Sequence, residues 1–178
     1  MSINTDNGLW LDPSKDWLRR WVMTRSGAPF NFLPHPVLML TRPNEPLSPE
    51  RAITLQSEFT SLLPLTLVTK AIEKIYSPVY FGSILVMIFE PNDAMRNLVR
   101  VQGGRAANIY NQGEFTPHMI LAPSFANSVT NRTFIGSMQT YTHGAEVVFD
   151  EVGYSANCRR EMMYESHVES FHDVISRY

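Results

Sequence analysis

The residues that decide the fold form one apolar run, VYFGSILVMIF, from Val79 to Phe89. Polar residues interrupt this run too rarely for a strand with one face in water, so we predict a central strand covered on both faces. The turn-forming stretch from Glu90 to Asp93 ends it. With about eleven residues the run is too short to cross a bilayer, which takes roughly twenty apolar residues.

The segment before this run carries helix signals. Ser48-Pro49-Glu50 is a strong helix start, and Pro64 marks a break or kink further on. Apolar residues recur at helical steps of three and four on both sides of that proline, at Ala52, Leu55, Phe59, Leu62, Val68, Ala71, Ile72 and Ile75. We therefore predict one kinked helix, or two consecutive helices, from Pro49 to Tyr76. The apolar run from Val37 to Leu40 predicts a first core strand.

After Phe89 the pattern becomes shorter and more typical of strands. It predicts short strands at Leu98–Val101, Ala107–Tyr110 and Phe115–Leu121. A hairpin is predicted where Thr133–Thr142 and Ala145–Val152 flank His143-Gly144, because glycine accepts a positive φ in a tight turn. The chain closes with a predicted helix whose apolar face holds Tyr164, Val168, Phe171 and Ile175.

The first residues of the chain predict a separable arm. Asp12-Pro13 opens a short amphipathic helix that runs to about Val22. A connector rich in proline follows from residue 26 to residue 36. We therefore divide the chain into an N-terminal aromatic arm, residues 1–35, and a globular domain, residues 36–178. The predicted class is a single α+β domain with an antiparallel or mixed sheet packed with helices.

Composition limits the classes of function. The 178 residues are 44% hydrophobic and 18% charged, which suits one globular domain with a core. A net charge of -2 gives no global positive field for nucleic acid or a membrane, so any such contact must be local. The single cysteine, Cys158, excludes an intramolecular disulfide and a zinc site with several thiolates, and it favours the cytoplasm.

No motif of high specificity predicts catalysis, a cofactor or a metal. His167 and His172 are five residues apart, whereas ligands on one helical face need spacings of three or four. We therefore expect a protein that is not an enzyme, with no cofactor and no small-molecule substrate. The alternative is a small intracellular enzyme with a pocket around His118, His143 and Glu146.

Two groups of residues are candidates for contact with partners. The tryptophans of the arm are predicted self-association contacts, or alternatively they fold back onto their own domain: Trp10, Trp17 and Trp21. Four arginines between residues 94 and 136 face only one acidic residue and are predicted to contact an anionic partner, or alternatively are solvated: Arg96, Arg100, Arg105 and Arg132.

The order of these predicted elements resembles the matrix proteins of rhabdoviruses, and the length suits the shorter plant-infecting members. The local likeness lies in GEFTPH from Gly113 to His118, in Phe134-Ile135-Gly136, and in AEVVFD from Ala145 to Asp150. The resemblance implies a non-enzymatic protein of the virion and host cytoplasm that self-associates and bridges nucleocapsid and membrane or neighbouring subunits. A different viral coat or inner-capsid protein is an alternative.

The chain departs from that family in two ways. Its N-terminus carries Asp6, Asp12 and Asp16, whereas animal-infecting members have a strongly basic N-terminus. It also lacks their Pro-Pro-x-Tyr motif. The implied partners are other copies of the chain, the nucleocapsid or its nucleic acid, and a membrane surface. Of these, the acidic N-terminus argues most against the membrane contact.

Overall fold

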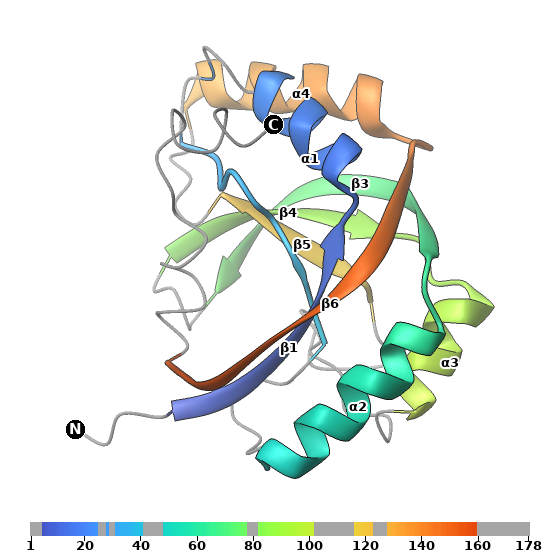
Figure 1. Cartoon of the computed structure of the whole chain (residues 1–178). Coiled ribbons are helices and arrows are strands. Elements are labelled where there is room, and N and C mark those ends of the chain that lie inside the picture. Colours follow the sequence, from blue (N-terminus) through green and yellow to red (C-terminus); the bar gives the residue numbers. More distant parts are fainter. Residues whose placement is uncertain are drawn as a thin grey trace.

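The computed structural model describes residues 5–24, 28, 31–40, 48–77, 82–101, 116–122 and 128–159. In these residues, antiparallel strands close into a barrel in the order β1-β2-β5-β4-β3-β6 (Figure 1). The strands are β1 (Thr5–Pro13), β2 (Leu38–Met39), β3 (Leu65–Ser77), β4 (Gly82–Phe89), β5 (His118–Ala122) and β6 (Glu146–Arg159). The helices are α1 (Lys15–Thr24), α2 (Pro49–Ser61), α3 (Asp93–Val101) and α4 (Val129–Thr142). The predicted α+β class is confirmed.

Strand β4 has the character that its sequence predicts. Every residue from Ile84 to Phe89 is buried. Leu85, Met87 and Phe89 belong to the main core, whereas the alternate residues form a second apolar cluster on the other face of the strand, at Ile84, Val86 and Ile88. Burial of both faces removes the need for polar residues along the strand, which explains the continuous apolar run.

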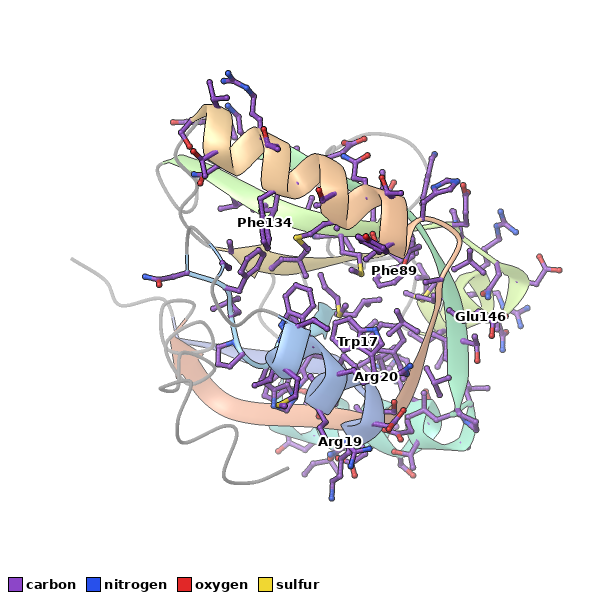
Figure 2. The ribbon with its side chains drawn as sticks, turned by 90° about the horizontal axis from the view of Figure 1, so that it is seen from above. Trp17, Arg19, Arg20, Phe89, Phe134 and Glu146 are labelled. Carbon is purple, nitrogen blue, oxygen red and sulfur yellow. The ribbon has the colours of Figure 1, made fainter. Side chains whose placement is uncertain are left out.

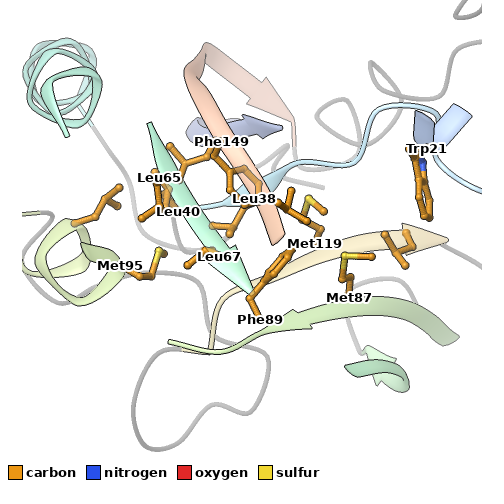
Figure 3. Close-up of a cluster of buried hydrophobic side chains, with 14 of the residues drawn as sticks. Trp21, Leu38, Leu40, Leu65, Leu67, Met87, Phe89, Met95, Met119 and Phe149 are labelled. Atoms are coloured by element: carbon orange, nitrogen blue, oxygen red, sulfur yellow. The ribbon is translucent and has the colours of Figure 1, made fainter. Parts of the chain in front are cut away.

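The barrel interior is filled by aliphatic and aromatic side chains (Figure 3). Leu38, Leu65 and Leu67 meet there, and the rings of Phe89 and Phe149 contact edge to face with centroids 5.7 Å apart. Helices α2 and α3 lie at one end of the barrel, and α1 and α4 lie at the opposite end (Figure 1). The core therefore extends from the barrel into both helical ends.

The predicted helix from Pro49 to Tyr76 is correct in its first half and wrong in its second half. Ser48 caps α2 by accepting a hydrogen bond from the backbone N–H of Arg51 at 3.2 Å. Beyond Pro64 the chain becomes strand β3, in which Leu65 and Leu67 are buried and Thr66 is exposed. The apolar residues of this segment fit the spacing of a helix and the spacing of a strand equally well. Pairing with β4 and β6 determines that the segment forms a strand.

Two predicted strands after Phe89 are helices. Leu98–Val101 belongs to α3, where the Asn92 side chain accepts from the N–H of Met95 at 2.8 Å and so caps the first turn. The predicted hairpin from Thr133 to Val152 is helix α4 followed by strand β6. Ser128 caps α4 by accepting from the N–H of Asn131 at 3.1 Å, and this cap went unrecognised in the sequence. Gly144, with φ of 77°, links the two elements.

The remaining predicted elements have separate outcomes. Val37–Leu40 contains β2, and Phe115–Leu121 overlaps β5. The short amphipathic helix near the N-terminus is α1. The predicted strand Ala107–Tyr110 and the predicted C-terminal helix lie outside the described residues.

The predicted division between residues 35 and 36 is not a division of this fold. Strand β1 pairs with β6 and with β2, so the chain from Thr5 onwards is part of the barrel wall. Leu9 and Leu11 are fully buried inside it, and Trp10 between them alternates to the other face. A separable arm would leave these two leucines in water, which is why the segment pairs with the barrel instead.

Candidate self-association surface

Helix α1 is held firmly on its end of the barrel. Ser14 caps it, because its side-chain oxygen accepts from the N–H of Trp17 at 3.3 Å. Trp21 is only 3% exposed, and its indole N–H donates to the carbonyl of Leu33 at 2.9 Å. Trp21 is therefore a core residue of its own subunit. The structure shows the alternative in which Trp21 folds back onto its own domain. Trp21 is therefore not a contact with another copy.

Aromatic rings connect α1 to α4. Trp17 stacks on Trp21 with ring centroids 5.4 Å apart. Phe32 then contacts Trp21 edge to face at 5.4 Å and Phe134 of α4 at 5.9 Å. Figure 2 shows Phe134 pointing from α4 toward α1, with Arg19 on the side of α1 away from α4. This aromatic row, Trp17, Trp21, Phe32 and Phe134, fixes both helices to one end of the barrel.

The C-terminal end of α4 is fastened to strand β3. The side-chain amide of Gln139 donates to the carbonyl of Ile72 at 2.7 Å. Just after the helix, Nδ1 of His143 donates to the carbonyl of Lys70 at 2.8 Å. On the inner side of the helix Asn131 and Met138 are buried. These contacts leave the opposite side of α4 facing outward.

The outward side of α4 is almost free of charge. The helix sequence, VTNRTFIGSMQTYT, contains Arg132 as its one charged residue. Val129 near its start is 70% exposed and Tyr141 near its end is 84% exposed. Gly136 lies between them, and a Cβ atom added there would meet nothing within 4 Å. Met23 of α1, at the same end of the barrel, is 62% exposed. We call Met23, Val129, Gly136 and Tyr141 the neutral surface.

Trp10 lies on the barrel wall rather than on an arm. It pairs across the strands with Gly153, and its indole ring occupies the space where a Cβ of residue 153 would lie. Its indole N–H donates to the carboxylate of Asp12 at 3.2 Å, and Nε2 of His35 lies 3.1 Å from the same oxygen. Trp10 is partly buried by these contacts.

The four predicted anion-contact arginines do not form one site. Arg96 and Arg100 are exposed on α3, where Arg96 pairs with Asp93 at 3.1 Å and Arg100 donates to Asn97 at 2.6 Å. Arg132 is exposed on α4, and Figure 1 places α3 and α4 at opposite ends of the barrel. Arg105 lies outside the described residues. Proximity in sequence did not bring these cations together because the barrel separates the helices that carry them.

The three residues of the alternative enzyme site are held separately. His118 is buried at the start of β5, and its Nδ1 donates to the carbonyl of Thr116 at 2.9 Å. Burial lowers the pKa of His118 to about 4, while the hydrogen bond to Thr116 acts in the opposite direction. His143 is exposed and held by Lys70, and Glu146 is exposed at the start of β6. Among the described residues no hydrogen bond joins any two of them.

Within the described residues, no three histidine, cysteine, aspartate or glutamate side chains are placed to hold a metal ion. None of the helices in that part of the chain is both long and apolar enough to span a bilayer. No protein-family model, curated protein or solved structure matches this sequence.

Sequence reasoning missed the neutral surface. Tyr141 falls within the predicted strand Thr133–Thr142, and Val129 lies before it, where no element is predicted. The available signal was the composition of residues 129–142, where one charge in fourteen residues is unusual for a surface helix.

Proposed function

We propose that the protein is a non-enzymatic, self-assembling viral structural protein of the matrix type, which acts in the virion and the host cytoplasm. In this role it bridges the nucleocapsid and a membrane, or neighbouring subunits. Its copies associate through the neutral surface at the α1–α4 end of the barrel. The observation that carries the proposal is the outward side of α4, which exposes Val129 and Tyr141 and carries a single charge.

The chemistry of this surface favours contact with protein over contact with water. Surface helices usually present lysine, glutamate and aspartate to solvent, and α4 has none of them. Protein interfaces are depleted in these residues at their centres and enriched in tyrosine and methionine. Because Arg132 is the one charged residue of α4, this side also meets a second copy of itself with little electrostatic repulsion. The neutral surface therefore suits contact between identical subunits.

The arginines of α3 suit the contact with a partner, which a bridging protein needs besides contact with its own copies. Arg96 and Arg100 are exposed at the end of the barrel opposite the neutral surface, so self-association leaves them accessible (Figure 1). We propose them as the contact with an anionic partner such as the nucleocapsid, because the arginine guanidinium suits phosphate. A bridging protein needs two such separate faces, one for its own copies and one for its partner.

Light scattering behind a sizing column tests the proposal. We expect the mass of the wild-type protein to rise with concentration over about a hundredfold range. The double variant V129E/Y141E places two like charges on the neutral surface and is expected to stay monomeric, because each copy then repels the next. Ile53→Glu is the matched control, since Ile53 of α2 is 60% exposed at the opposite end of the barrel. It should associate like the wild type, and so should R96A/R100A.

The effect of salt distinguishes an apolar contact from a contact made by charges. Apolar contacts are not screened by salt, so association through the neutral surface should persist at high ionic strength. Association that disappears at high salt, or that is unchanged in V129E/Y141E, contradicts the assignment of the surface. A wild-type protein that remains a monomer at every concentration contradicts self-assembly altogether.

A further inference from the structure

Among the described residues, the narrowest pairing of the barrel lies between β2 and β5. Strand β2 spans two residues, and in that part of the chain it pairs with β5 through the one partner pair Leu38 and Met119. One further backbone bond crosses nearby, from the N–H of Leu33 to the carbonyl of Leu121 at 2.7 Å. By comparison, β1 pairs with β2 at Trp10 and Leu11, and it pairs with β6 over most of Thr5–Pro13. The β2–β5 seam is therefore where the barrel opens at the lowest cost in broken hydrogen bonds.

His118 is the residue next to this seam. It is the first residue of β5, adjacent to Met119, and it is only 8% exposed. It pairs across the strands with Ile88 of β4, so its side chain lies on the same face as the apolar cluster of Ile84, Val86 and Ile88. The barrel thus holds a titratable ring on a buried apolar face, directly beside its narrowest pairing.

The hydrogen bonding of His118 suits only its neutral form. Because a carbonyl oxygen can only accept, Nδ1 carries the hydrogen that is donated to Thr116 at 2.9 Å. Among the described residues Nε2 has no hydrogen-bond partner. Protonation would put a second N–H and a positive charge at that nitrogen, in a place where the described residues supply no acceptor.

The charged groups that the structure describes on neighbouring elements do not offset such a charge. Strand β4 is followed by Glu90, which is exposed, and β3 beyond it carries three exposed charged residues, Lys70, Glu73 and Lys74. Strand β2 itself has no ionisable residue, and His35 before it lies against the carboxylate of Asp12. Burial is accordingly the largest influence on the pKa of His118 and lowers it to about 4.

We propose that His118 is an acid-sensitive latch, whose protonation opens the barrel at the β2–β5 seam. Opening lets the imidazolium ring reach water, which relieves the cost of a charge on an apolar face. It also leaves β2 and β5 with unpaired edges, and unpaired edges are where strands add to other chains. This inference concerns the barrel alone and does not rest on the proposed function.

The size of the effect follows from proton linkage. In the open form the ring is in water with its ordinary pKa of 6.5, whereas in the closed form the pKa is about 4. Above pH 6.5 both forms are neutral and the closed form keeps its full stability. As the pH falls below 6.5, only the open form takes up the proton, and the opening equilibrium rises by roughly 30-fold by pH 5. The increase levels off below about pH 4, where both forms are protonated.

Hydrogen exchange at single amides tests the latch in the full chain. The amide of Leu33, which donates to the Leu121 carbonyl across the seam, should lose protection between pH 7.5 and pH 5, after correction for the intrinsic exchange rate. The amide of Trp10, which lies on the β6 side of β1, should not, because the pairing of β1 with β6 does not depend on His118. His118→Asn keeps a side-chain N–H for the Thr116 carbonyl and cannot take up a proton, so its seam should show no such loss.

His143→Asn is the matched control, because His143 also donates through Nδ1 to a backbone carbonyl but is exposed. It should behave like the wild type. The proposal is overturned if the protection of Leu33 in the wild type stays flat down to pH 5, or if Leu33 and Trp10 lose protection together. It is equally overturned if His118→Asn keeps the full pH dependence. The wild-type comparison of Trp10 with Leu33 decides the matter even where the variant does not fold.

Discussion

Two residues, Trp10 and Gly153, show how closely the first strand packs against its partner in the barrel wall. Trp10 lies across Gly153 on the partner strand, and the indole ring fills the space that a side chain at position 153 would need. The same tryptophan is anchored by its hydrogen bond to Asp12. The glycine is therefore required by the tryptophan, and the two residues act as one packing unit.

Gly153→Ala should destabilise the protein. The new Cβ displaces the Trp10 ring from its place and from Asp12, and such overpacking costs about 1–3 kcal/mol. Urea unfolding followed by circular dichroism measures the loss as a lower midpoint with an unchanged slope. A midpoint equal to that of the wild type would show that the ring moves aside freely, contrary to the packing described.

Elements show how far sequence alone could predict the fold. The prediction for β4 was correct because a strand buried on both faces leaves one unmistakable pattern, a continuous apolar run. The second half of the predicted helix from Pro49 to Tyr76 was wrong because its apolar spacing fits two periods, and only the neighbouring strands decide between them. The predicted hairpin was wrong in its first strand, because the β-branched residues of α4 favour strands. The Ser128 side chain, which caps the first turn, favours a helix instead.

The candidate site was less predictable than the fold, because it depends on which residues remain exposed. Trp21 was a strong candidate by residue type, yet its ring is in the core and donates to Leu33. Tyr141 and Val129 were not candidates, yet they are among the most exposed large apolar residues of the described chain. Which single side chains of a helix stay exposed depends on how the assembled barrel and its two helical ends cover them.

Helix α4 offers a prediction at the scale of an element. Gly136 lies inside the helix with open space around its Cα, so nothing within the subunit requires a glycine there. Gly136→Ala should therefore stabilise the isolated subunit by about 0.5–1 kcal/mol, the usual advantage of alanine over glycine in a helix. Thermal unfolding at low protein concentration measures this gain. A loss of stability would mean that α4 is packed differently from the contacts described.

At the scale of the whole molecule, the barrel divides its surface between two ends. Helices α1 and α4, joined by the aromatic row, present the neutral surface at one end. Helix α3 presents Arg96 and Arg100 at the other (Figure 1). In the described residues the strands close into a barrel, so assembly in the closed form relies on helical surfaces, and opening of the β2–β5 seam would make further strand edge available for pairing.

The central claim is that copies of the chain meet through the neutral surface, and hydroxyl-radical footprinting of the wild-type protein tests it most directly. Tyr141 and Tyr76 are a matched pair in one molecule, 84% and 70% exposed, with Tyr141 on α4 and Tyr76 on β3. As the protein concentration rises and particles grow, oxidation of Tyr141 should fall several-fold while that of Tyr76 stays constant. Growth of the particles with Tyr141 oxidised at an unchanged rate would contradict the claim.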